Sequence, residues 1–181
     1  CHLLSVGGLQ NMESKIGNKI VILGVSASGK TSFARKLGEK TGLPVTYMDE
    51  VMWRPGWKYI GDEETTAQIE KISKGDSWII EGFIDKNSQQ ALFEKADKLL
   101  YLDYPGWLSA WRYILRWLKH RKNPRPELPD SPEKFSFEFL LRVYKKKEVY
   151  RLEKLFKVVD FGAKTVRFKS PMEAEQFLKS L

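Results

Sequence analysis

The feature that most constrains the fold is a glycine-containing segment that lies between a strand-like apolar run and a helix-like amphipathic pattern. The apolar run KIVILG (19–24) predicts a buried strand, and GVSASGKT (24–31) follows it directly. An amphipathic pattern then extends to about Thr41 and predicts a helix. The segment fits the spacing GxxxxGK[ST], and this motif requires a strand before it and a helix after it. We therefore expect a tight loop between a strand and the N-terminus of a helix.

The residue types in this loop are those that hold phosphate groups. Glycines let the backbone pass close to phosphate oxygens, and the amides of a helix N-terminus point at the anion. Lys30 is expected to bridge the β- and γ-phosphates, and the Thr31 hydroxyl to bind Mg²⁺. ATP and Mg²⁺ are the expected cofactors, and the expected cofactor-binding residues of the loop are Gly24, Ser26, Ala27, Ser28, Gly29, Lys30, Thr31 and Ser32.

Short apolar runs alternate with helical patterns along the rest of the chain. Further strands are predicted at 44–48, 77–81, 98–103 and 163–168, with helical patterns between most of them. Near-continuous apolar strands indicate a buried parallel sheet with helices on both faces. The expected fold class is α/β, a three-layer P-loop NTPase fold with a five-stranded parallel sheet.

Residues 105–157 interrupt this alternation, because they contain two helical segments and no strand. In the first segment an apolar stripe at helical spacing lies beside a basic stripe formed by Arg112, Arg116 and Lys119. The apolar stripe consists of Trp107, Leu108, Trp111, Ile114, Leu115 and Leu118. The proline-rich stretch 123–132 separates the two segments.

The excess of positive charge lies in the same part of the chain. Lys and Arg number 31 against 23 Asp and Glu, a net charge of +8. Between Arg112 and Lys157 there are 14 basic and 6 acidic residues, so this segment accounts for the whole excess. Such a field attracts polyanions, and charge alone does not distinguish a nucleotide from a nucleic-acid backbone.

Composition excludes several other classes of protein. One cysteine, Cys1, rules out an intrachain disulfide framework and a multi-cysteine zinc site. No apolar run approaches the roughly 18 residues of a membrane span, so we expect no membrane partner and a cytoplasmic location. Residues 1–11 show no clean periodicity and are expected to be an artificial extension or a disordered tail, with the domain formed by 12–181.

Beyond the loop, three segments resemble adenylate-kinase-like P-loop kinases, and most closely the subgroup called DNA topology modulation proteins. They are GLPVTYMDEVMWRPGW (42–57), WIIEGF (78–83), and Pro105 followed seven and eleven residues later by Arg112 and Arg116. In that family the two arginines begin a lid over ATP, so the resemblance implies a helical lid at about 112–151. It departs at Ile84-Asp85, where the family has a Pro-Arg pair that grips a phosphorylated acceptor, which argues against a nucleoside monophosphate.

The remaining candidates are polar or aromatic residues at predicted strand ends. Glu81 ends a strand that should neighbour the loop strand, and Asp103 ends another apolar run, so the two compete to hold Mg²⁺ through water. Asp49 follows the second strand, where it would position an acceptor hydroxyl or cap a helical turn. Arg112 and Arg116 would stabilise the transferred phosphoryl group. The further expected substrate-binding residues are Trp53, Arg54, Trp57, Glu81, Arg142 and Arg151, and packing is the competing explanation for the tryptophans.

These observations predict an ATP-dependent phosphotransferase with an unidentified acceptor, acting as a monomer or dimer. A guanine-specific NKxD motif is absent, and 181 residues are few for a motor ATPase. The alternative is a nucleic-acid-binding protein that uses its basic segment and has nucleotide as a regulator, although no helix-turn-helix, RRM or zinc signature supports it.

Overall fold

A five-stranded parallel sheet forms the centre of the molecule. The computed structural model describes residues 16–82, 86–124, 131–158 and 161–181. The strands are β1 (Lys19–Gly24), β2 (Val45–Tyr47), β5 (Trp78–Glu81), β6 (Lys98–Leu102) and β7 (Thr165–Phe168), in the order β2-β5-β1-β6-β7. This confirms the predicted α/β fold with five parallel strands, and it places β1 between β5 and β6.

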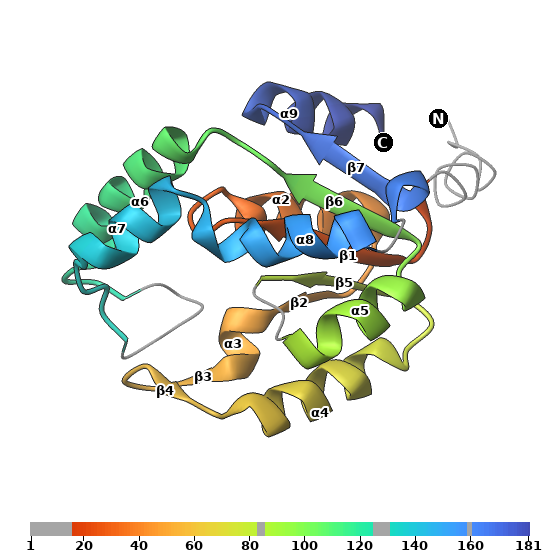
Figure 1. Cartoon of the computed structure of the whole chain (residues 1–181), viewed down its shortest axis with the longest axis horizontal. Helices are drawn as coiled ribbons and strands as arrows, with labels where there is room; N and C mark the ends of the chain where they lie inside the picture. Colours follow the sequence, from red (N-terminus) through yellow and green to blue (C-terminus); the bar gives the residue numbers. More distant parts are fainter. Residues whose placement is uncertain (1–15, 83–85, 125–130, 159–160) are drawn as a thin grey trace, which may run out of the picture.

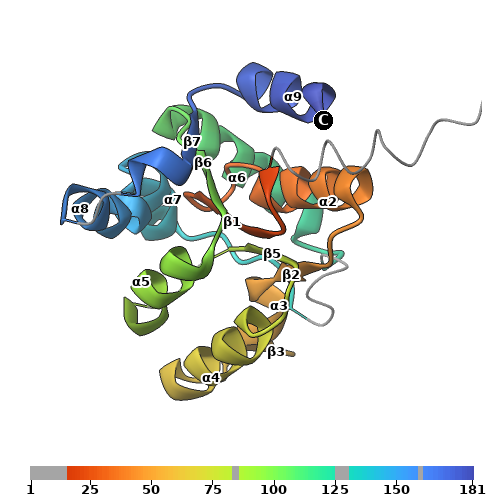
Figure 2. The same ribbon diagram turned by 90° about the vertical axis from the view of Figure 1, so that its right-hand side faces the viewer.

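Helices cover both faces of the sheet, so the molecule has three layers (Figure 1, Figure 2). On one face α2 (Lys30–Thr41) and α9 (Pro171–Ser180) pack against Ile20 and Ile22 of β1. On the other face α4 (Asp62–Ser73), α5 (Lys86–Lys95) and α8 (Tyr150–Val158) pack against Val21 and Leu23. Successive residues of a strand point to opposite faces, which is why one apolar run serves two separate cores.

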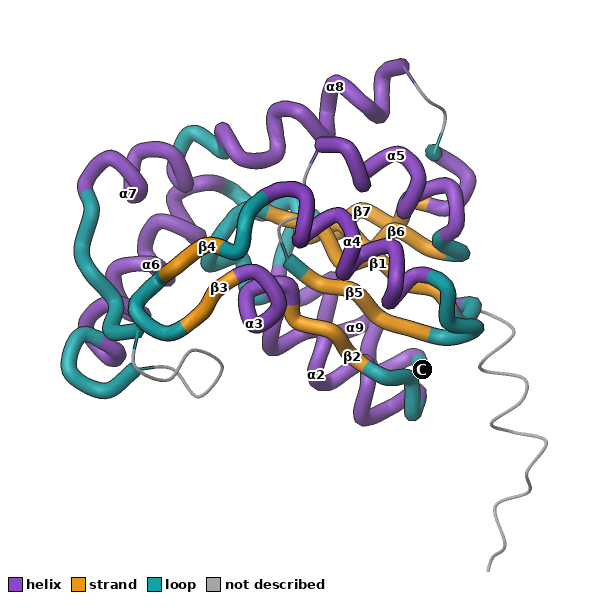
Figure 3. Tube along the Cα trace, turned by 90° about the horizontal axis from the view of Figure 1, so that it is seen from below, coloured by secondary structure: helices purple, strands orange, loops and turns teal. Residues whose placement is uncertain are grey.

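The aromatic segment after β2 forms regular secondary structure. It begins with the short helix α3 (Met48–Met52) and continues into an antiparallel hairpin of β3 (Trp53–Arg54) and β4 (Lys58–Tyr59). The hairpin turn contains Gly56 and Trp57, which both have positive φ, of 78° and 60°. Figure 3 shows both short strands next to α3.

The strand-free stretch forms two packed helices and a return to the core. α6 (Gly106–His120) and α7 (Phe137–Tyr144) run antiparallel, since Gly106 abuts the carbonyl of Tyr144 while the rings of Tyr113 and Phe139 lie 5.0 Å apart. The predicted second helix is interrupted after Tyr144. Lys146 adopts a left-handed conformation, and the short 3-10 helix η1 (Lys147–Val149) leads into α8.

The packing of this stretch restricts what part of it could move. Val143, Val149 and Leu152 are buried in the same cluster as Val21 and Leu23 of β1. Phe139 of α7 also packs against this cluster. A lid over 112–151 stays a prediction, and a closing movement that included Phe139 or the residues after it would disturb this core. None of the helices in the described part of the chain combines the length and apolar character needed to cross a bilayer.

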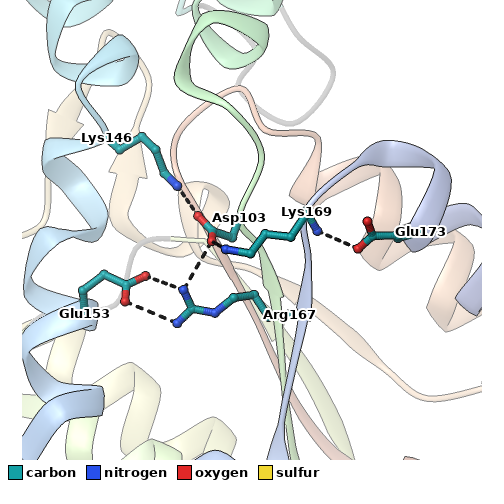
Figure 4. A network of polar contacts seen from close by, with 6 residues as sticks. All are labelled: Asp103, Lys146, Glu153, Arg167, Lys169 and Glu173. Atoms are coloured by element: carbon teal, nitrogen blue, oxygen red, sulfur yellow. Dashed lines mark hydrogen bonds and ion pairs between the residues drawn. The ribbon is translucent and has the colours of Figure 1, made fainter.

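A polar network ties the end of the sheet to the helical segment (Figure 4). The carboxylate of Asp103, just after β6, accepts hydrogen bonds from Lys146 and Lys169 and lies 3.2 Å from Nη1 of Arg167. Arg167 also pairs with Glu153 of α8 at 3.0 Å. Burial alone would raise the pKa of Asp103, but the hydrogen bonds from Lys146 and Lys169 outweigh it and hold that pKa below its usual value.

Replacing Asp103 with asparagine tests the contribution of this network to stability. At neutral pH we expect Asp103→Asn to lower the free energy of unfolding by about 2 kcal/mol, because the partly buried Lys146 and Arg167 lose the carboxylate that they pair with. Lys169 should contribute little to this loss, because its side chain is largely exposed. The folded pKa lies below the unfolded one, so the contribution is present above about pH 4 and is lost as pH falls through the folded pKa.

Chemical denaturation at a series of pH values measures both effects. Wild type should lose more stability on acidification than Asp103→Asn, and the two curves should converge in acid. Glu175→Gln, which breaks an exposed pair with Lys36, is the control and should change little at neutral pH. Parallel curves for wild type and Asp103→Asn would contradict a folded-state role for the ionised carboxylate.

Candidate functional site

The loop between β1 and α2 has the backbone geometry that its glycines predict. Gly24 has φ 152°, and a Cβ there would lie 2.8 Å from the Ser28 hydroxyl oxygen. Gly29 has φ 99° and precedes the first residue of α2, so its conformation turns the chain into the helix. The loop therefore curls tightly at the N-terminus of α2, where amides and the helix dipole favour an anion.

The two motif side chains at the start of α2 have defined partners. Nζ of Lys30 donates to the carbonyl of Val25 at 3.0 Å, which keeps the ammonium group at the loop. The Thr31 hydroxyl donates to Oε1 of Glu81 at 3.0 Å. Glu81 ends β5, is only 3% exposed, and reaches Thr31 because β5 pairs with β1. The predicted adjacency of the Glu81 strand and the loop strand is thus confirmed.

Glu81 and Asp103 were alternative partners for a metal, and the geometry separates them. Glu81 hydrogen-bonds the motif hydroxyl and lines the cavity described below, whereas Asp103 is bound by Lys146, Arg167 and Lys169 and does not line it. The structure therefore brings Glu81, and not Asp103, together with Thr31.

A cavity of about 1370 Å³ opens over the loop. It gathers the loop, the cationic side of α6 and the aromatic hairpin at the carboxyl ends of the strands, where α/β sheets bind ligands. The predicted site residues that line it are Gly24, Ser26, Ala27, Ser28, Gly29, Lys30, Thr31, Ser32, Asp49, Trp53, Trp57, Glu81, Arg112, Arg116 and Arg142.

Two predicted residues are not in this group. Arg54 turns away, because its Nη1 donates to the carbonyl of Val51 at 3.1 Å and its Nη2 lies 3.5 Å from Glu64. It does not line the cavity, and the expected substrate contact from Arg54 has no support in the geometry. The side chain of Arg151 lies outside the described part of the structure.

The two arginines of α6 enter the cavity from the side opposite the sheet end. Nη1 of Arg112 donates to the carbonyl of Ser28 at 2.6 Å, and its guanidinium carbon lies 5.6 Å from the centre of the Tyr104 ring. Nε of Arg116 lies 3.2 Å from Oε1 of Glu133, whose side chain is 6% exposed. Arg112 is thus fixed against the loop, while Arg116 is held one helical turn further away by a buried carboxylate.

Glu148 of η1 makes a contact that no sequence pattern predicted. Its Oε2 accepts a hydrogen bond of 2.6 Å from the backbone amide of Ser26, inside the loop. Its Oε1 lies 3.9 Å from Nε of Arg142, a residue that was expected to contact substrate. A carboxylate from a residue 122 positions later thus binds one amide of an anion-binding loop. Only the fold brings these segments together, so spacing carried no signal.

The hairpin forms the aromatic wall of the cavity. The Trp53 ring lies 5.6 Å from that of Trp57 and 5.5 Å from that of Tyr59. Nε1 of Trp57 donates to the carbonyl of Pro132 at 3.1 Å, and the amide of Gly56 donates to the Ser131 hydroxyl at 3.1 Å. These bonds join the hairpin to the chain between α6 and α7.

The arrangement has two chemically distinct halves. The loop amides, Lys30, Arg112 and Arg116 present donors and positive charge, which suits a polyphosphate. Asp49, Trp53, Trp57 and Tyr59 present a carboxylate and aromatic surface, which suits a second, less charged molecule. Among the described residues there is no cluster of three or more His, Cys, Asp and Glu that could hold a metal.

Comparisons with known proteins show which solved structures share this fold. No protein-family model matches the sequence, and no curated protein matches it either. Among solved structures, shikimate kinase from Acinetobacter baumannii in complex with shikimate has a TM-score of 0.61 at 14% identity, covering 93% of this chain and 93% of that one.

Two sugar-type kinases are also similar. A sugar kinase from a Janibacter species has a TM-score of 0.53 at 19% identity, covering 89% of this chain and 90% of that one. A gluconokinase from Sinorhizobium meliloti has a TM-score of 0.51 at 14% identity, covering 91% of this chain and 89% of that one. At these identities the similarity concerns the fold, which this chain shares with these kinases.

Proposed function

We propose that the protein is a phosphotransferase that moves the γ-phosphoryl group of ATP to a hydroxyl group of a small acceptor. The observation that carries the proposal is the Thr31–Glu81 hydrogen bond, which lies in one cavity with Lys30, Arg112 and Asp49. Phosphoryl transfer requires a site for Mg²⁺, cations near the transferred group and a base near the acceptor. Thr31 and Glu81 would provide the first, Lys30 and Arg112 the second, and Asp49 the third.

The residues present fit a magnesium ion brought in with the nucleotide. Mg²⁺ keeps several waters and takes few protein ligands, usually with substrate phosphates completing its shell. The Thr31 hydroxyl and the Glu81 carboxylate, 3.0 Å apart, would hold the ion, Glu81 through water. When bound, Mg²⁺ neutralises charge on the β- and γ-phosphate oxygens.

The protein's own groups would act on the two ends of the transferred phosphoryl group. The acceptor oxygen forms a bond to the γ-phosphorus as the bond from that phosphorus to the β–γ bridging oxygen breaks, so ADP leaves with the bonding electrons. Asp49 accepts the proton of the acceptor hydroxyl. Lys30, Arg112 and Arg116 stabilise the negative charge on the transferred group and on the leaving oxygen.

The acceptor is proposed to bind between Asp49 and the wall of Trp53, Trp57 and Tyr59. The similar structures are described as sugar kinase, gluconokinase and shikimate kinase, whose named substrates carry hydroxyl groups. A nucleoside is the other candidate, since a planar base would also pack on tryptophan. The resemblance to the DNA topology modulation subgroup remains part of this proposal and adds no further constraint on the acceptor.

The nucleic-acid alternative stays an untested prediction. Several cations of the basic segment are engaged inside the molecule, with Arg112 on the Ser28 carbonyl, Arg116 on Glu133 and Lys146 on Asp103. Such side chains contribute less to binding an external phosphate backbone than exposed ones do. The phosphotransferase is therefore the function that the geometry favours.

Phosphorus NMR with Mg-ATP and a panel of sugars, polyols, nucleosides and nucleoside monophosphates tests the proposed reaction. We expect ADP and a new phosphate ester to appear with wild type. Lys30→Ala should slow transfer by at least about a hundredfold, because the phosphoryl charge loses a preorganised cation. Lys71→Ala, which removes an exposed lysine of α4, is the matched control and should leave the rate unchanged.

Asp49→Asn separates chemistry from nucleotide binding in the same assay. It should slow transfer by about a hundredfold or more while leaving the affinity for Mg-ATP close to that of wild type, since Asp49 faces the acceptor half. The proposed reaction would be contradicted if wild type formed no more ADP than Lys30→Ala with every acceptor in the panel.

The Glu148 contact leads to a prediction about nucleotide affinity. A phosphate that binds the Ser26 amide must displace the Glu148 carboxylate, so the free protein is biased toward a state that excludes it. Glu148→Gln weakens this charge-assisted hydrogen bond, and we expect it to tighten Mg-ATP binding by about threefold to tenfold.

Calorimetric titration of Mg-ATP measures that change directly. Glu153→Gln is the matched control, because Glu153 also pairs with an arginine but does not line the cavity. Its affinity should equal that of wild type. Weaker binding by Glu148→Gln would mean that the carboxylate assists nucleotide binding instead of competing with it.

A further inference from the structure

The apolar stripe of α6 that the sequence shows is only partly used in the core. Four of its residues remain in contact with solvent: Trp107 is 62% exposed, Trp111 55%, Leu115 46% and Leu118 47%. They recur at intervals of four, four and three residues, so they lie along one side of the helix. We call these four residues the α6 face.

The opposite sides of α6 explain why this face is left over. Ser109, Ala110 and Tyr113 are buried, and the rings of Tyr113 and Trp117 pack on Phe139 and Phe135 beside them. Arg112 and Arg116 point into the cavity. The packing of α6 against the rest of the molecule therefore does not involve the α6 face. A contiguous row of exposed Trp and Leu side chains is typical of an interaction surface.

The location of the α6 face allows access by a large partner. Figure 1 shows α6 and α7 together at one end of the molecule, far from α4 and the C-terminus. The neighbouring helix α7 also has exposed aromatic residues, Phe137 (64%) and Tyr144 (54%). No described segment of the chain covers the four residues.

The charged residues of α6 and of the two positions after it are all basic, although Arg112 and Arg116 among them line the cavity. Residues 106–122 contain five basic residues and no Asp or Glu. Lys119, Arg121 and Lys122 are exposed at the C-terminal end of the helix, where the apolar row finishes. A partner that fits must therefore combine a surface accepting Trp and Leu with negative charge beside it.

We propose that the α6 face binds the surface of an anionic lipid bilayer, with its tryptophans and leucines among the headgroups and acyl chains. This replaces the expectation of no membrane partner, which rested on the lack of a spanning apolar run and does not bear on binding at the membrane surface. Helices with Trp and Leu on one side and Lys and Arg around them lie in the membrane interface without spanning it. A second copy of the chain fits less well, because pairing two α6 faces brings two clusters of cations together. Nucleic acid fits less well too, because its phosphates would meet apolar side chains along the centre of the face.

Vesicle sedimentation with the whole protein tests the proposal. We expect cosedimentation with vesicles containing about 30% phosphatidylglycerol, little with pure phosphatidylcholine, and loss of binding as salt rises. The double variant Trp107→Ser, Trp111→Ser should bind anionic vesicles at least about tenfold more weakly. Met172→Ser is the matched control, since Met172 of α9 is 68% exposed and lies elsewhere, and its binding should equal that of wild type.

A second measurement does not depend on how the double variant folds. Lipids brominated near the headgroup should quench the tryptophan fluorescence of wild type when the vesicles are anionic. The proposal would be overturned by equal binding to neutral and anionic vesicles, or by the absence of fluorescence quenching. It would also be overturned if the double variant kept the wild-type circular dichroism and bound anionic vesicles as tightly as wild type.

Three other results would assign the face elsewhere and equally overturn the proposal: concentration-dependent dimerisation without vesicle binding, preference for an acidic polypeptide such as polyglutamate, or preference for nucleic acid. The assays need neither ATP nor an acceptor, so their outcome is independent of the proposed phosphotransferase activity.

Discussion

The pairing of β1 between β5 and β6 is the constraint on which the candidate site depends. It brings the end of β5 beside the loop that leaves β1, so that Glu81 reaches the Thr31 hydroxyl at 3.0 Å. The loop glycines then let the chain turn into α2 with its amides facing the cavity. Removing either the strand pairing or the turn would separate the carboxylate from the hydroxyl, whatever side chains were kept.

The helical segment between β6 and β7 completes the site from the other side. Arg112 binds the Ser28 carbonyl at 2.6 Å and Glu148 binds the Ser26 amide at 2.6 Å, so both ends of the segment contact the same loop. The Asp103 network and the buried Val143 and Val149 hold its second half to the sheet. The cavity is thus built from a rigid sheet end and a helical segment that is anchored in its second half.

Much of the fold could be predicted from the sequence, because each strand is a short apolar run and the loop motif fixes the order of strand, turn and helix. The five strands, the adjacency of the Glu81 strand to β1, and the helix after Pro105 were all predicted. The hairpin was not, because Gly56 and Trp57 turn the chain through positive φ angles that only glycine signals in advance.

The site was predicted less completely than the fold, because several of its contacts join residues that are far apart in the sequence. The loop residues and the α6 arginines were found by motif and by spacing, and they line the cavity. The expected substrate contact of Arg54 has no support in the geometry, because Arg54 does not line the cavity and its Nη2 lies 3.5 Å from Glu64 of α4. Glu148 and Glu133 were missed, since their roles arise from contacts with Ser26 and Arg116 that no local pattern encodes. The exposed α6 face was likewise read as an apolar stripe with no indication of which part would be buried.

The central claim is that Glu81 and Thr31 together hold the magnesium of a bound nucleotide, and one titration tests it directly. ATP binding to wild type and to Glu81→Gln is measured by calorimetry with and without Mg²⁺. The account predicts that Mg²⁺ strengthens ATP binding to wild type by about tenfold or more and has little effect on Glu81→Gln, while metal-free binding is similar in both. An undiminished response of Glu81→Gln to Mg²⁺ would contradict it.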